Sequence, residues 1–253
     1  MPDAPVVASD AVPENHFDGW VAAHYDATVA DRFDPAVLAP TVDVLAELAH
    51  GRRALELAIG TGRVALPLIE RGVDVVGIEL SEAMVAQLRA KPGGDAVAVT
   101  MGDMTTARVD GAFGLVYLVF NTINNLLTQD AQVACFENAA AHLEPGGCFV
   151  VEVGVPALQW LPPGERIRPF AATDTHVGFD EYDAATQWMA SHHLYRLDGE
   201  WQEFTMPFRY VWPSELDLMA RIAGLHLRDR WEDWHRTPFT AGSRAHVSVW
   251  EKP

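Results

Sequence analysis

The sequence predicts an α/β protein built on a mostly parallel sheet. Residues 54–59 form a short apolar run that meets a glycine loop at Gly60 and Gly62, and a helical segment follows before a second apolar run ends at Glu79. This order of strand, loop, helix and strand is the unit from which parallel sheets are built. Residues 113–120 are almost entirely apolar, as expected for a strand that is buried on both faces of a sheet.

Helix and strand signals continue in the same alternation along the chain. Helices are expected after Asp34, after the glycine loop, and after three possible N-cap residues, which are Ser81, Thr128 and Ser214. Pro40 is expected to kink or divide the first of these helices, because a proline inside a helix removes a hydrogen bond. Further strands are expected over 96–101, 148–153, 225–234 and 245–250. The last two would close the sheet as an antiparallel pair.

The glycine loop points to a nucleoside ligand that carries a negative group. Gly60 and Gly62 allow the backbone to approach a ligand closely, and the N–H groups at the start of the next helix suit an anion. Glu79, at the end of the second strand, can accept hydrogen bonds from both ribose hydroxyls. A nicotinamide dehydrogenase and an S-adenosylmethionine methyltransferase both remain open on this pattern. Glu56 favours the second, because a carboxylate inside a parallel strand needs a partner such as the ammonium of a methionine moiety.

Four segments resemble class I S-adenosylmethionine-dependent methyltransferases. A-L-E-L-A-I-G-T-G (54–62) resembles their first motif, and G-I-E-L-S (77–81) resembles their second-strand acid. G-D-M (102–104) is similar to the adenine-binding motif, and L-E-P-G-G (143–147) is similar to the turn before the fifth strand. The order and spacing of these segments are more specific than the glycine loop alone. Among these enzymes, the chain is most similar to the small-molecule group that includes bacterial sugar N-methyltransferases.

The resemblance implies a Rossmann-like seven-stranded methyltransferase sheet with helices on both faces and an antiparallel β insertion after the fifth strand. It also implies S-adenosyl-L-methionine as cofactor and S-adenosyl-L-homocysteine as product. Asp103 would lie at the adenine amino group, while Tyr25 would either close over the cofactor or serve only in packing. The residues expected to bind the cofactor are Tyr25, Glu56, Ala58, Gly60, Thr61, Gly62, Arg63, Glu79, Leu80, Met84, Gly102, Asp103, Met104 and Phe120.

The expected reaction is methyl transfer to nitrogen or oxygen of a small molecule, such as a secondary metabolite or an amino sugar. A sulfonium methyl is already activated, so the protein mainly holds the nucleophile in line and excludes water. Asn121 is a candidate for contact with the methionine end or the acceptor, because it follows a central strand. The candidate catalytic bases are His192, His193, His176 and His235, none of them fixed by a motif, and we select His192 among them. No metal is expected, since His192 and His193 point to opposite faces of one strand and no acidic cluster has zinc spacing.

The chain divides into four predicted segments. Residues 1–15 are expected to be a flexible tail, 16–155 the cofactor-binding core with an N-terminal helical cap, 156–212 a substrate-capping insertion, and 213–253 the C-terminal helix and closing strands. The insertion contains a hairpin around Asp198-Gly199. Its aromatic and methionine side chains, with Trp188 and Phe208 facing inward, are expected to roof the acceptor pocket. These side chains are Trp188, Met189, Tyr195, Phe204, Met206, Phe208 and Tyr210.

Charge and composition narrow the classes of partner. The 253 residues contain 18 basic and 35 acidic side chains, which gives a net charge of −17. This charge disfavours nucleic acids and anionic membrane surfaces as partners. No apolar run approaches the length of a membrane span, and Cys135 and Cys148 are expected to be core thiols, which fits a cytoplasmic protein.

Several alternatives remain open on the sequence. A non-catalytic S-adenosylmethionine-binding protein or partner subunit would keep the same cofactor motifs. An NAD-dependent oxidoreductase would use Glu79 but leaves Glu56 and Asp103 unexplained. A homodimer is open as well, because the aromatic side chains of the hairpin could equally form a subunit interface.

Overall fold

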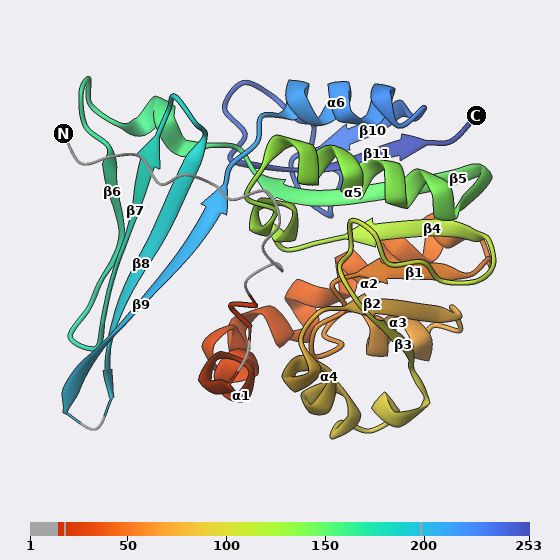
Figure 1. The fold of residues 1–253 in the computed structure, drawn as a ribbon, viewed down its shortest axis with the longest axis horizontal. Helices are drawn as coiled ribbons and strands as arrows, with labels where there is room; N and C mark the ends of the chain where they lie inside the picture. The colour runs from red at the N-terminus through yellow and green to blue at the C-terminus, as the bar shows by residue number, and fades with distance from the viewer. Residues whose placement is uncertain (1–14, 18, 198) are drawn as a thin grey trace.

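A seven-stranded sheet forms the centre of the protein (Figure 1). The computed structural model describes residues 15–17, 19–197 and 199–253, so the predicted tail lies outside the described residues except for Asn15. The strand order is β10-β11-β5-β4-β1-β2-β3. β1 to β5 pair in parallel, whereas β11 runs antiparallel to both β5 and β10. The strands are β1 Ala54–Leu57, β2 Val75–Glu79, β3 Ala98–Met101, β4 Phe113–Leu118, β5 Leu143–Gly154, β10 His226–Trp231 and β11 Ala245–Glu251.

Helices cover both faces of this sheet. The helices are α1 Gly19–Thr28, α2 Pro35–Ala49, α3 Ala65–Glu70, α4 Glu82–Arg89, α5 Gln129–His142 and α6 Pro213–Ile222. Side chains of α2 and α3 pack with Leu115 and Tyr117 of β4 in one hydrophobic core. Side chains of α5 and α6 pack with Val116 and Leu118 in a second core, on the opposite face of the same strand. The predicted seven-stranded sheet with helices on both faces is therefore confirmed.

Two predicted helix caps are confirmed, a third is wrong, and Pro40 does not divide its helix. The hydroxyls of Ser81 and Thr128 accept hydrogen bonds from backbone N–H groups in the first turns of α4 and α5. α2 continues through Pro40 without a break. The buried face of the helix holds the residues before and after Pro40 in the helical conformation. Ser214 does not cap α6; Trp212 is its N-cap residue, and Pro213 occupies the first turn. No described helix is long and apolar enough to cross a membrane.

An antiparallel insertion lies between β5 and α6, as predicted (Figure 1). It is a sheet of four strands, of which the sequence predicted only the hairpin of the last two. Its strands, in the order β6-β7-β8-β9, are β6 Ile167–Ala172, β7 His176–Asp183, β8 Trp188–Leu197 and β9 Glu200–Arg209. The ring of Phe204 in β9 stacks on Trp20 of α1, with 4.5 Å between ring centroids. We call the face that carries Phe204 the inner face and the opposite one the outer face.

The prediction that Trp188 and Phe208 both face inward is wrong for Trp188. In an antiparallel pair, residues opposite each other share a face and neighbours along a strand alternate. Phe208 pairs with Met189, on the face of Phe204, whereas Trp188 pairs with Arg209. Trp188 therefore belongs to the outer face.

A buried arginine fastens the inserted sheet to the core. Arg209, at the end of β9, donates hydrogen bonds to Gln132 of α5 at 2.5 Å and to Glu215 of α6 at 2.7 Å. It also bonds to Gln187, which precedes β8, at 3.2 Å. Arg209 is only 6% exposed, so these partners offset the cost of burying its charge. The base of the sheet is thus fixed to two helices of the core.

Candidate active site

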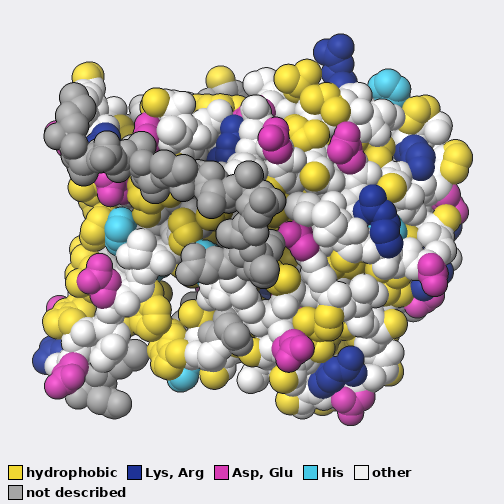
Figure 2. Space-filling model, viewed as in Figure 1, with side chains coloured by type: hydrophobic (Ala, Val, Ile, Leu, Met, Phe, Trp, Pro, Cys, Tyr) yellow, Lys and Arg dark blue, Asp and Glu magenta, His cyan; other side chains and the backbone are white. Residues whose placement is uncertain are grey.

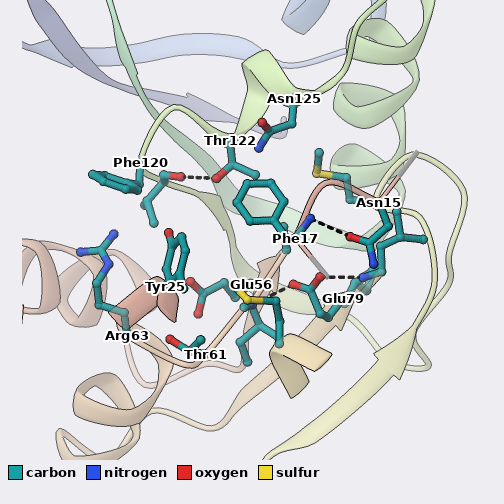
Figure 3. Close-up of a pocket in the computed structure, with 18 of the residues that line it drawn as sticks. Asn15, Phe17, Tyr25, Glu56, Thr61, Arg63, Glu79, Phe120, Thr122 and Asn125 are labelled. Carbon is teal, nitrogen blue, oxygen red and sulfur yellow. Dashed lines mark hydrogen bonds between the residues drawn. The ribbon is translucent and has the colours of Figure 1, made fainter. Parts of the chain in front are cut away.

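A pocket opens at the carboxyl ends of β1, β2 and β4 (Figure 3). This is the edge at which open parallel sheets bind ligands. The pocket has an empty volume of about 1060 Å³, including its open mouth. Of the fourteen predicted cofactor-binding residues, all but Gly62 line it. They are Tyr25, Glu56, Ala58, Gly60, Thr61, Arg63, Glu79, Leu80, Met84, Gly102, Asp103, Met104 and Phe120.

The two glycines of the loop serve different purposes. Gly60 has a φ of +57° and lines the pocket, so its backbone is accessible to a ligand. Gly62 has a φ of +78°, and a Cβ at this position would approach the side chain of Leu88 in α4 to 2.3 Å. Gly62 is therefore required for packing of the loop against α4, which explains why it does not line the pocket.

Glu79 lies at the end of β2 and orders the glycine loop. One carboxylate oxygen accepts a hydrogen bond from the N–H of Gly60 at 2.8 Å. The other accepts from the N–H groups of Leu80 at 2.9 Å and Ser81 at 2.8 Å. Burial raises the pKa of Glu79, and the three N–H donors oppose that shift. A carboxylate has about four lone-pair positions, so one remains by this count for a ligand hydroxyl.

Glu56 is a buried carboxyl group whose protein partner is a tyrosine. The hydroxyl of Tyr117 in β4 donates a hydrogen bond of 2.8 Å to Glu56. Burial raises the pKa of Glu56 to about 8, although the Tyr117 hydrogen bond and the charge of Arg63 act in the opposite direction. Tyr117 was not identified from the sequence. It lies beside Glu56 only because β1 pairs with β4, and this pairing joins segments that are far apart in the chain.

Asp103 borders the pocket and also stabilises its own loop. One carboxylate oxygen accepts hydrogen bonds from the N–H and the hydroxyl of Thr105, at 2.7 and 2.8 Å. The adjacent residues Gly102 and Met104 line the pocket with it. An aspartate that caps a turn through one oxygen can still present its other oxygen to a ligand.

The N-terminal helix is tied to the glycine loop by a group that we call the Asp26 latch, which consists of Asp26, Thr61 and Lys91. The hydroxyl of Thr61 donates to Asp26 at 2.6 Å, and Lys91 forms an ion pair with Asp26 at 2.5 Å. Lys91 also donates to the backbone oxygen of Thr61 at 2.8 Å. The latch holds α1 over the loop, and Tyr25, the neighbour of Asp26, lines the pocket (Figure 3).

Several pocket residues were not identified from the sequence. The segment before α1 contributes Phe17, whose backbone oxygen accepts a hydrogen bond from Ser81 at 2.6 Å and whose ring lies edge-on to Tyr25. This ring joins that of Phe120, a predicted residue with a left-handed backbone (φ of +59°), whose ring centroid lies 4.9 Å from the guanidinium of Arg63. Further lining residues that were missed are Asn15, His16, Ile59, Val64, Ile78, Val119, Thr122, Asn125 and Leu126. Thr122 and Asn125 had a signal, since polar residues follow the apolar run of β4.

The structure does not bring the two predicted catalytic residues to the pocket. Asn121 accepts a hydrogen bond from the N–H of Gly154 at 2.6 Å, which is a loop-stabilising contact. His192 is an outer-face residue of β8; its ring stacks on Phe179 at 4.6 Å, and its Nδ1 lies 3.0 Å from the hydroxyl of Thr205. Neither side chain lines the pocket. Both predictions rested on sequence position alone, which did not determine where the side chains point.

Comparison with known proteins identifies the family. Residues 54–147 match a family described as a methyltransferase domain. The solved structure of the CcbJ methyltransferase from Streptomyces caelestis is 38% identical, with a TM-score of 0.78, over 88% of this chain and 96% of that one. The cypemycin N-terminal methyltransferase of Streptomyces sp is 28% identical over 244 residues, which are 90% of this chain and 97% of that protein.

A second curated relative matches over less than half of each chain. The dTDP-3-amino-3,4,6-trideoxy-alpha-D-glucopyranose N,N-dimethyltransferase of Streptomyces venezuelae is 36% identical over 98 residues, which are 39% of this chain and 40% of that protein. The similarity to CcbJ spans nearly the whole of both chains, and the glycine loop, Glu79 and Asp103 gather at one pocket. The chain therefore belongs to the S-adenosylmethionine-dependent methyltransferase family, and S-adenosylmethionine is its cofactor.

Proposed function

We propose that this enzyme transfers the methyl group to an amine nitrogen of a small molecule. The observation that carries the proposal is the pocket itself, which collects Glu56, Glu79 and Asp103 and is also lined by aromatic side chains. The names of two relatives, the cypemycin N-terminal methyltransferase and the amino-sugar N,N-dimethyltransferase, support nitrogen as the attacking atom.

The residues of the pocket fit the cofactor. Glu79 would accept a hydrogen bond from a ribose hydroxyl through its remaining lone pair, and Asp103 would accept one from the adenine amino group. Leu80 and Met104 line the pocket and would provide apolar contact for the adenine ring. Glu56 is a buried carboxyl group with a raised pKa, and a ligand ammonium would favour its charged form. The bound cofactor supplies an activated methyl group.

The remaining task of the protein is to position the acceptor and exclude water. Tyr25, Phe17 and Phe120 surround the pocket with aromatic side chains (Figure 3). The turn Thr122–Asn125 lines the pocket and packs against β9. The inserted sheet therefore lies against a turn that lines the pocket, where it can contact an acceptor.

Nitrogen is favoured over oxygen by the positions of the histidines. Methyl transfer to a hydroxyl benefits from a general base, whereas an amine reacts in its neutral form without one. His192, the predicted base, lies on the outer face, and among the described histidines only His16 lines the pocket. An amine acceptor requires no further group from the chain.

A turnover assay tests the proposed function. The enzyme is incubated with S-adenosylmethionine and a panel of small amines and alcohols, and formation of S-adenosylhomocysteine is followed together with the mass of the acceptor. We expect one or more amines to gain a methyl group and the matched alcohols to gain none. Transfer to alcohols alone would contradict nitrogen as the acceptor atom. Tight binding of S-adenosylhomocysteine without turnover of any acceptor would favour a non-catalytic role.

We further propose a cytoplasmic location and a homodimer formed through the outer face. The warrant for the dimer is exposed apolar surface on that face, where Val177 is 38% and Trp188 is 39% exposed. Sedimentation at several concentrations tests the dimer, with Trp188→Ser as the variant expected to dissociate it. A monomer at all concentrations would contradict it.

A further inference from the structure

A group of polar side chains occupies the inner face of the inserted sheet, outside the cofactor pocket. We call it the histidine cluster; its members are His176, Asp180, Ser191, His193 and Tyr195. The strand register places His176 opposite Tyr195 and Asp180 opposite Ser191, so these side chains share one face. Across β9, His193 pairs with Phe204, the residue that stacks on Trp20. The cluster therefore faces α1 and not the outer surface.

Hydrogen bonds fix the order of donors and acceptors in the cluster. Ser191 donates to the carboxylate of Asp180, so its oxygen is available to accept from His193 Nε2, which lies 3.2 Å away. His193 Nδ1 is then an acceptor, with His176 Nε2 at 3.0 Å and the Tyr195 hydroxyl at 3.3 Å. These two donors compete for one acceptor, because a neutral imidazole has a single unprotonated nitrogen. One of them is left to donate to another group.

Aromatic rings border the cluster. Phe170 lies over Gly178, where a Cβ would approach its ring to 2.3 Å, and its centroid is 5.2 Å from that of His193. Tyr195 and Phe204 lie on the other side, with 6.4 Å between their centroids. In Figure 2 an open gap separates the lower part of this sheet from the rest of the molecule. The inner face thus offers ring surfaces and hydrogen-bonding groups side by side.

The charges of the cluster indicate the kind of ligand. Burial lowers the pKa of His176 and of His193 from the ordinary 6.5, so both rings are neutral at pH 7. Arg168 lies on the same face, opposite Asp180, whose negative charge partly neutralises it. Arg168 also forms a hydrogen bond with Tyr182. Neutral imidazoles and a phenol recognise hydroxyl groups, whereas a phosphate would require unpaired cations. The flanking aromatic rings suit the apolar faces of a saturated ring.

We propose that the histidine cluster is a subsite for the part of the acceptor remote from the reacting amine, and that it selects a neutral ring bearing hydroxyl groups. The inference rests on the proposed N-methylation. His193 and Tyr195 contact the ring in this arrangement, and Asp180 and Ser191 act as positioning residues that hold the tautomer of His193. Binding energy from such a remote contact holds the amine in place for transfer.

Two amines with the same ring size test the subsite. Methyl glucosaminide carries ring hydroxyls and cyclohexylamine carries none. With saturating S-adenosylmethionine, we expect the wild-type kcat/KM to favour methyl glucosaminide by at least about tenfold, as for a site built to bond hydroxyls. His193→Phe keeps a ring but cannot bond, so it should raise the KM for methyl glucosaminide by about tenfold and change kcat by less than about twofold.

Controls separate this role from a structural one. Leu194→Ala, the next residue along β8 and on the outer face, should keep the wild-type preference. The affinity for S-adenosylhomocysteine should be the same in all variants. If His193→Phe does not fold, Tyr195→Phe carries the same comparison with a smaller expected loss, because it removes one hydroxyl and keeps the ring. Histidine ring signals in the wild-type complex with S-adenosylhomocysteine should shift on addition of methyl glucosaminide and not of cyclohexylamine.

The outcomes are distinguishable. Equal kcat/KM for the two amines in the wild type, or an unchanged preference in both variants, would overturn the subsite and leave N-methylation standing. A drop in kcat that is the same for both amines would also overturn the subsite, because His193 would then contribute to the methyl transfer itself or to folding. Methylation of neither amine by protein that binds S-adenosylhomocysteine would contradict the proposed N-methylation, and the subsite with it.

Discussion

Tyr117 of β4 donates a hydrogen bond of 2.8 Å to Glu56 of β1, and both side chains are buried. With its pKa raised to about 8 by burial, Glu56 holds a proton at pH 7. A ligand ammonium beside it would lower this pKa again. Proton release on cofactor binding follows from this arrangement, and it can be measured.

We expect binding of S-adenosylhomocysteine at pH 7 to release nearly one proton per site. Calorimetry in two buffers of different ionisation enthalpy gives this number from the difference in the observed heat. Glu56→Gln should bind with no such release, because an amide does not titrate. The same proton release in the wild type and the variant would show that Glu56 is not coupled to the ligand.

Glu56 should also make the free energy of unfolding fall as pH rises. The unfolded chain loses this proton near its ordinary pKa of 4.5, whereas the folded protein keeps it until about pH 8. The folded state therefore binds more protons between these values, and this group lowers stability by at most about 1.4 kcal/mol per pH unit there. Urea unfolding at pH 5 and pH 8 should show a smaller loss for Glu56→Gln than for the wild type. Equal losses would argue against the raised pKa.

The Asp26 latch should slow the departure of the cofactor. Asp26→Ala removes both the hydrogen bond from Thr61 and the partner of Lys91, and we expect the affinity for S-adenosylhomocysteine to fall by about 1 kcal/mol, mainly through faster dissociation. Asp31→Ala is the control, because Asp31 lies in the same N-terminal cap with a side chain that is 75% exposed. Equal dissociation rates for the two variants, measured by stopped flow, would exclude the latch as a determinant of binding.

Glu79→Ala should impair both binding and stability. Loss of the charge-assisted hydrogen bond to the ribose should weaken S-adenosylhomocysteine binding by about 1 to 3 kcal/mol. The substitution also removes the acceptor for Gly60, Leu80 and Ser81, so we expect a loss of about 1 to 3 kcal/mol in the free energy of unfolding. Glu82→Ala, at an exposed position of α4, is the control. Normal binding by Glu79→Ala would remove Glu79 from the cofactor site.

The cofactor pocket could be predicted well because its determinants are local in sequence. A strand followed by Gly60 and Gly62 fixes the loop, and an acid at the end of the next parallel strand must lie beside it. Glu79 accepts a hydrogen bond from Gly60 for this reason. The same locality explains the confirmed caps at Ser81 and Thr128.

The other features of the site depend on contacts between segments that are distant in the sequence. The approach of Tyr117 to Glu56 needs the β1–β4 pairing, and that of Asp26 to Thr61 needs the docking of α1. No short-range pattern indicates either contact. His192 shows the limit most clearly, because alternation along β8 separates it from His193 but does not reveal which of the two faces α1.

Titration calorimetry of the purified wild-type protein with S-adenosylhomocysteine and with NAD tests the central claim most directly. The pocket contains Glu56, Glu79 and Asp103 at one edge of the sheet, and this set suits the ammonium, ribose and adenine of S-adenosylhomocysteine. We predict saturable binding of S-adenosylhomocysteine at one site per chain and no measurable heat with NAD. Tight binding of NAD with no response to S-adenosylhomocysteine would contradict the account.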